Sequence, residues 1–155
     1  MKIQISNERR IEDLPTMWPV EDTHVDMILP ITAPSLFPFN KERLTKIYDF
    51  GALGNCTPQD ISKTIMQWLR ALKKGGSIII VEVDFERATR QFIGADISVD
   101  EFNTIYNRRT HLVKEDLAEK LQNIGVPFDN IRQWTGGHKD FLVHPHEFVM
   151  EVIKP

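Results

Sequence analysis

Residues 57–85, TPQDISKTIMQWLRALKKGGSIIIVEVDF, predict one helix, one tight turn and one buried strand. Thr57 suits a helix cap, Pro58 suits the first helical position, and Asp60 stands where a capping box places its acid. The residues that recur at helical spacing and form one apolar face are Ile61, Ile65, Trp68, Leu69 and Leu72. Gly75-Gly76 predicts the end of the helix, because glycine adopts the left-handed conformation at little cost.

The strand predicted from Ser77 to Val83 is apolar on both of its faces, since four aliphatic residues follow one another at 78–81. A strand of this kind lies in the middle of a sheet that helices cover on both sides. A helix that leads directly into such a strand is half of an α/β unit. The stretch therefore predicts an α/β fold with this strand at its centre.

The remaining elements follow from the same kind of pattern. Strands are predicted at 1–6, 25–29, 44–50, 126–134 and 141–153, and helices at 85–93, 99–106 and 114–123. The last strand alternates apolar and polar residues, as a partly exposed antiparallel strand does. The order predicts a Rossmann-like, doubly wound sheet that is mostly parallel and has an antiparallel C-terminal hairpin. We expect a single domain over residues 1–155.

Composition narrows the function classes. The chain has 155 residues and a net charge of −3, so no basic surplus indicates nucleic acid. Cys56 is the one cysteine, which excludes an internal disulfide and is compatible with a reducing compartment. No stretch has the apolar length of a membrane span, and the start lacks the apolar core of a signal peptide. We expect a cytoplasmic location, or the host cytoplasm or virion for a viral protein.

Residues 68–87, WLRALKKGGSIIIVEVDFER, resemble a region of small class I S-adenosylmethionine-dependent methyltransferases. That region has the form W-x-R-V-L-K-P-G-G, then an apolar strand, then E-V-P-D-[FL]-E. The resemblance extends to 35–61, similar to the family's LPF…D-EIYA-HVLEH stretch, and to 111–126, similar to its late helix. The opening MKIQIS is similar to its first strand. The resemblance implies a methyltransferase-like domain over most of the chain.

The chain departs from this family around the cofactor. The family's first strand runs into a glycine-rich turn of the G-C-G type, whereas Ser6, Asn7 and Glu8 stand here, and no glycine precedes Gly51. Side chains at that turn would collide with the cofactor, and a carboxylate would lie near the cofactor's own. The acidic residue that holds the ribose falls near 17–18, and H-V-L-E-H reads as GALGN at 51–55. The resemblance thus implies a retained scaffold without a cofactor.

Two functions follow from these departures. The first is a methyltransferase-like domain that has lost S-adenosylmethionine (SAM) and has no catalytic residues. It would serve as a structural or protein-interaction component of a larger assembly, for which a virus is one setting, and would bind a protein partner or itself. The alternative is an active SAM-dependent methyltransferase with an unusual cofactor loop. In that case the cofactor contacts would come from Ser6, Asn7, Glu8, Asp49 and Gly51.

A cluster of histidines near the end of the chain, His138, His144 and His146, is a weak candidate for a metal site. Ordinary surface imidazoles explain it better, because no cysteine pair or HExxH helix accompanies it, and we expect no metal. Cys56 reads as a small buried residue rather than a nucleophile. Asp84, after the central strand, reads as the cap of the following helix. Trp18 lies between prolines and suits an exposed protein contact.

Overall fold

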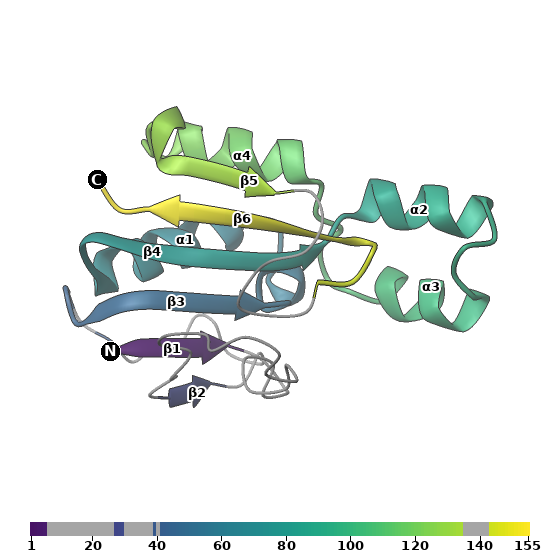
Figure 1. Cartoon of the computed structure of the whole chain (residues 1–155), viewed down its shortest axis with the longest axis horizontal. Helices are drawn as coiled ribbons and strands as arrows, with labels where there is room; N and C mark the ends of the chain where they lie inside the picture. The colour runs from purple at the N-terminus through teal and green to yellow at the C-terminus, as the bar shows by residue number, and fades with distance from the viewer. Residues whose placement is uncertain (6–26, 30–38, 40, 135–142) are drawn as a thin grey trace, which may run out of the picture.

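The computed structural model describes residues 1–5, 27–29, 39, 41–134 and 143–155 (Figure 1). These residues form a six-stranded sheet of order β2-β1-β3-β4-β6-β5. Its strands are β1 (Lys2–Ile5), β2 (Met27–Leu29), β3 (Leu44–Phe50), β4 (Leu72–Val83), β5 (Ile131–Trp134) and β6 (Glu147–Ile153). Residues Trp18 and His138 lie outside the described part of the chain.

The sheet combines a parallel half with an antiparallel hairpin. β1 pairs in parallel with both β2 and β3, and β3 pairs in parallel with β4. β6 lies between β4 and β5 and is antiparallel to both, which confirms the predicted sheet. The strand order reverses between β1 and β3. Ligands of doubly wound sheets bind beyond the carboxyl ends of the strands at such a point, so this edge is where a site is expected.

The main core lies between the sheet and two helices, α1 (Ile61–Ala71) and α4 (Lys114–Asn123). Trp68 of α1 and Leu117 of α4 are fully buried against Ile47 and Ile78 of the sheet. A second cluster occupies the opposite face of the sheet around Tyr48, Phe50, Ile79, Val81 and Val149. β4 is therefore buried on both faces from Ser77 onward, as the apolar run at 78–81 predicts.

The predicted end of the first helix is wrong. α1 stops at Ala71, and Leu72 to Gly76 belong to β4 instead of a turn. Leu72 is fully buried and pairs with Leu44, so the sheet takes the chain before the glycines are reached. The register then shifts between Leu44 and Lys46, which leaves residues 73–76 as a bulge. The predicted start also differs: Thr57 donates to Asp60 (2.7 Å), and Asp60 is the N-cap residue without a side-chain cap bond.

Two helices, α2 (Phe85–Ile93) and α3 (Val99–Tyr106), extend beyond the carboxyl end of β4 (Figure 1). Asp84 caps α2 by accepting a hydrogen bond from the Arg87 amide (3.1 Å), which confirms the predicted cap. Tyr106, the last residue of α3, is 57% exposed.

Two short 3-10 helices are η2 (Leu53–Asn55) and η3 (Phe128–Asn130). The second of these, which follows Pro127, makes β5 shorter than predicted. In the described part of the chain, no helix has both the length and the apolar character that crossing a membrane would require.

Candidate functional site

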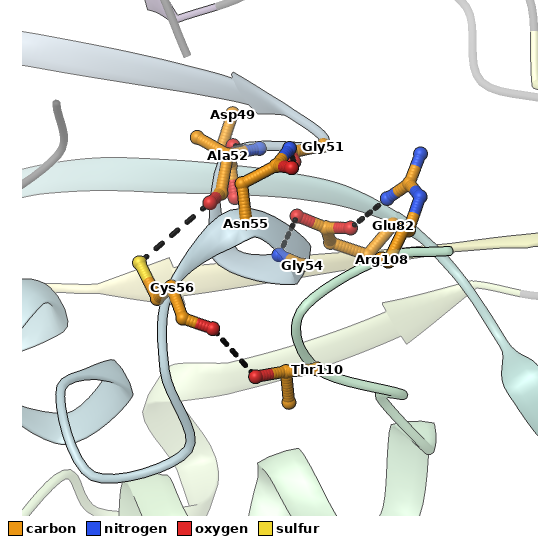
Figure 2. Close-up of polar contacts among 9 residues, drawn as sticks. All are labelled: Asp49, Gly51, Ala52, Gly54, Asn55, Cys56, Glu82, Arg108 and Thr110. Carbon is orange, nitrogen blue, oxygen red and sulfur yellow. Dashed lines mark hydrogen bonds and ion pairs between the residues drawn. The ribbon is translucent and has the colours of Figure 1, made fainter. Parts of the chain in front are cut away.

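The turn that follows β3, residues 51–56, lies at the carboxyl edge of the sheet (Figure 2). Gly51 begins it with a φ of +89°, a conformation that side chains rarely adopt, and its amide donates to the Val81 carbonyl (3.1 Å). Asp49, two residues earlier, accepts a hydrogen bond from the Ala52 amide at Oδ1 (2.8 Å). The turn is thus tied to both β3 and β4.

A second carboxylate supports the same turn from β4. Glu82 accepts the Gly54 amide at Oε1 (3.0 Å) and the Arg108 guanidinium at Oε2 (2.8 Å). Figure 2 shows Glu82 between these two partners. Arg108 comes from the loop between α3 and α4 and is 28% exposed, whereas the Glu82 side chain is fully buried. One acid therefore fixes the η2 turn and the α3–α4 loop together.

Both carboxyl groups are shielded from water, and this changes their pKa values. Burial raises the pKa of Asp49 well above its ordinary value; the neighbouring Glu82 raises it further, and Arg108 opposes the shift less strongly. Burial likewise raises the pKa of Glu82, against the opposing effect of Arg108. The two acids share this one guanidinium, so together they carry one more negative charge than it balances when both are ionised.

Asp49 has spare hydrogen-bonding capacity. Its Oδ2 atom is buried, and no described residue gives it a hydrogen bond. Asp49 pairs across the sheet with Ile5, the last residue of β1, which places it at the β1–β3 reversal. A buried acceptor without a donor destabilises a protein by about 1–3 kcal/mol. The position therefore suits a ligand group that is positively charged and donates hydrogen bonds.

Gly54 is required by close packing rather than by its backbone angles. A Cβ atom added there would lie 2.8 Å from Nη1 of Arg108 and 3.0 Å from Oε2 of Glu82. The resembled family has glutamate at this position of its H-V-L-E-H motif. In this chain, Arg108 and Glu82 occupy the space that such a side chain would need, so the loss of that glutamate accompanies a different, filled arrangement.

The turn ends at Cys56, whose backbone is fixed by a hydrogen bond and whose thiol is not activated as a nucleophile. Thr110 donates from its amide to the Gly54 carbonyl (3.1 Å) and from Oγ1 to the Cys56 carbonyl (2.5 Å). The Cys56 thiol is buried, and burial raises its pKa to about 11. A thiol with this pKa has almost no thiolate at neutral pH, so the interpretation of Cys56 as a small buried residue is confirmed.

His144 and His146 directly precede β6 and lie near the carboxyl end of β4, because β6 runs antiparallel to β4. The His144 and His146 rings stack with centroids 5.8 Å apart, and the His146 carbonyl accepts the Asp84 amide (2.9 Å). Nδ1 of His146 lies 3.8 Å from Oε1 of Glu101, too far for a hydrogen bond. Among the described residues, no three His, Cys, Asp or Glu side chains are placed to share a metal ion. Burial lowers the pKa of His146 from its ordinary value, which favours the neutral imidazole.

The structure brings some of the predicted site residues together. Asp49 and Gly51 meet at the end of β3, whereas Ser6, Asn7 and Glu8 lie outside the described residues. Sequence reasoning missed Glu82 and Arg108 as site residues. A carboxylate inside the apolar run IIIVEV is a signal that could have found Glu82, because a buried acid needs a partner. Arg108 carries no comparable local signal.

Comparison with known proteins gives matches at the level of structure. No family model and no curated protein matches the sequence. The plantazolicin methyltransferase BpumL matches with a TM-score of 0.62 and 13% identity, over 99% of this chain and 76% of BpumL. A possible histamine N-methyltransferase from Thermotoga maritima matches with a TM-score of 0.55 and 17% sequence identity, over 86% of this chain and 65% of that protein. PigF matches with a TM-score of 0.52 and 11% sequence identity, over 83% of this chain and 35% of PigF.

The matched proteins are longer than the region that this chain covers. This chain spans 65% of the Thermotoga protein, 35% of PigF and 34% of the CurJ carbon methyltransferase. PigF and BpumL were both solved with S-adenosylhomocysteine (SAH). This finding contradicts our expectation of no cofactor, which rested on three altered motifs in an otherwise retained scaffold. The chain has the fold of class I SAM-dependent methyltransferases.

Proposed function

We propose that the protein is a SAM-dependent methyltransferase whose cofactor lies at the carboxyl ends of β1 and β3. The observation that supports this most is the buried Asp49 carboxyl at the strand reversal, with one oxygen that no described residue satisfies. SAM carries a sulfonium and an ammonium group, and both are positively charged, as a ligand group beside the Asp49 carboxylate should be. The SAH-bound relatives of the same fold support the same choice.

The residues at the edge fit such a ligand. Asp49 supplies the counter-charge, and Gly51 offers a bare backbone beside it. The Glu82–Arg108 pair holds the 51–56 turn in place, so that Asp49 and Gly51 keep their positions without rearrangement. SAM supplies an electrophilic methyl group on its sulfonium when bound.

Within this proposal the chain's own groups also handle a proton. An acceptor that loses a proton when it is methylated needs a base, and neutral His146 at the same edge of β4 is the candidate.

Isothermal titration with SAM, SAH and 5′-methylthioadenosine tests the proposal. Methylthioadenosine keeps the nucleoside but lacks both positive groups. We expect Asp49→Asn to weaken SAM binding at least tenfold and to leave methylthioadenosine unchanged. A ligand at one hundred times its dissociation constant also stabilises the native state by about 2.7 kcal/mol, which a thermal unfolding curve detects.

Asp84→Asn is the matched control, because it makes the same chemical change in an acid whose role is to cap α2. It should leave SAM affinity within about twofold, since asparagine caps helices as well as aspartate. Absence of SAM binding to the unmutated protein would overturn the proposal. Equal losses in the two variants would remove Asp49 from the site.

A further inference from the structure

A hollow lies at the amino end of β3, on the opposite edge of the sheet from the turn at 51–56. It has a volume of about 580 Å³, and the described residues that line it are Phe39, Lys41, Arg43, Gln67 and Arg70. Lys41, Arg43 and Arg70 are all exposed, and none of the described lining residues is acidic. Three cations around one hollow are notable in a chain whose net charge is −3.

Backbone hydrogen bonds hold these cations together. The Glu42 amide donates to the Arg70 carbonyl (3.1 Å), and the Arg43 amide donates to the Ala71 carbonyl (2.8 Å). Glu42 takes a φ of +58° to make this connection. The segment before β3 is thereby fixed against the last turn of α1, so Lys41 and Arg43 stay beside Arg70.

The local acid does not neutralise the group. Glu42 stands between Lys41 and Arg43 in sequence, but its Oε1 lies 3.9 Å from Nζ of Lys154, which does not line this hollow. Helix capping is also an insufficient reason for three cations. The terminal carbonyls of α1 at Arg70 and Ala71 already accept backbone amides, so little of the helix end remains for side chains to satisfy.

Gln67 adds a second feature to the hollow. It lies one helical turn before Arg70 on α1, and its Oε1 atom is buried without a hydrogen-bond partner among the described residues. A ligand that carries only negative oxygens would leave this acceptor unsatisfied. A ligand that also carries a hydroxyl or N–H donor would satisfy it.

We propose that this hollow, lined by Lys41, Arg43, Arg70 and Gln67, binds a phosphorylated small molecule. Arginine pairs with phosphate oxygens through two parallel N–H groups, which suits Arg43 and Arg70. The site is separate from the turn at 51–56, because Lys41 and Arg43 precede β3 whereas that turn follows the carboxyl end of β3. It does not depend on the methyltransferase proposal.

Titration with inorganic pyrophosphate and with ADP, followed by calorimetry and by amide NMR shifts, tests the proposal. We expect both probes to bind, with shifts at Lys41, Arg43 and Arg70, and the affinity to fall as salt rises. Arg43→Gln and Arg70→Gln should each lower the affinity about tenfold. These side chains are exposed, so both variants should keep the unfolding curve of the unmutated protein.

Arg90→Gln is the charge-matched control, because Arg90 is exposed on α2 and pairs with Glu86. It should leave pyrophosphate affinity unchanged. Tighter binding of ADP than of pyrophosphate, lost in Gln67→Leu, would assign Gln67 to the organic part of the ligand; equal binding would assign the site to phosphate alone. No binding, or losses as large in Arg90→Gln as in the two test variants, would overturn the proposal.

Discussion

Glu82 and Arg108 form an ion pair of 2.8 Å between Oε2 and Nη1, although 26 residues separate them in the sequence. The pair joins the middle strand of the sheet to the loop before α4. It also closes over Gly54, whose amide donates to the other oxygen of Glu82. The shape of the candidate site therefore depends on a charge pair whose arginine has no local signal in the sequence.

Replacement of Arg108 by methionine should destabilise the protein by about 3 kcal/mol at pH 7, because Glu82 is left buried without a cation. Arg108 opposes the raised pKa of Glu82, so the pKa rises further in the variant. The destabilisation should shrink as the pH falls and Glu82 takes up a proton. Urea unfolding at pH 7 and at pH 5 measures the loss in free energy of unfolding at each pH. The double variant with Glu82→Gln should recover part of the loss, and an equal loss at both pH values would contradict this reading.

Gly54→Ala should cost about 1–3 kcal/mol, because the new Cβ would meet Arg108 Nη1 at 2.8 Å and Glu82 Oε2 at 3.0 Å. Gly94→Ala is the control, since the first atom its Cβ meets is Oδ2 of Asp96 at 3.2 Å, on an exposed and adjustable side chain. Thermal unfolding of the two variants compares them directly. If they lose equal stability, the crowding at Gly54 is not the cause.

Asp49→Asn should stabilise the unliganded protein at pH 7. The folded pKa of Asp49 lies above the ordinary value of about 3.9, so folding is penalised as the pH rises above 4 and the acid must ionise in the interior. Asparagine keeps an acceptor for the Ala52 amide without the charge. The gain should therefore be largest at neutral pH and disappear near pH 4. Urea unfolding at several pH values checks this, and a constant gain would argue against titration of Asp49.

SAM affinity should increase with pH over the same range, because a cationic ligand favours the ionised form of Asp49 and its binding releases a proton. Calorimetry in two buffers of different ionisation enthalpy measures the proton release. The Asp49→Asn variant should bind more weakly and with no such pH dependence. Proton release that persists in the variant would have to come from another group.

Asp84→Ala should lower the free energy of unfolding by about 1 kcal/mol, because it removes the side-chain cap of α2. Asp84→Asn retains an acceptor for the Arg87 amide and should be near neutral. Chemical denaturation of both variants separates capping from charge. A loss of equal size in the two would indicate that the charge of Asp84 matters and not its hydrogen bond.

The apolar pattern of the sequence was enough to predict most of the architecture. The unbroken aliphatic run at 78–81 indicates a strand buried on both faces, and β4 is that strand. The helix end was misplaced because Gly75 and Gly76 are a strong local stop signal, while Leu72 joins the sheet through its partner Leu44. Pairing between distant residues decides such a boundary, and a single sequence does not display it.

The site was predicted less well for a related reason. The missing glycines at 6–8 suggested the loss of a ligand, but those residues lie outside the described part of the chain. Asp49 was included among the candidate contacts, but its buried and half-satisfied carboxyl is visible only in three dimensions. The contribution of Arg108 depends on a tertiary contact with Glu82, so its neighbourhood in the sequence contains no indication of it.

The outer strand β5 has only four residues, and its central Arg132 and Gln133 are exposed. Arg132 faces Glu151 of β6 at 3.8 Å. A short edge strand with a charged side chain offers few free backbone groups to a strand of another molecule. Natural sheets use such edge strands to resist edge-to-edge aggregation. This side of the sheet should therefore remain inert at high protein concentration, even though the adjoining strands are among the most apolar in the chain.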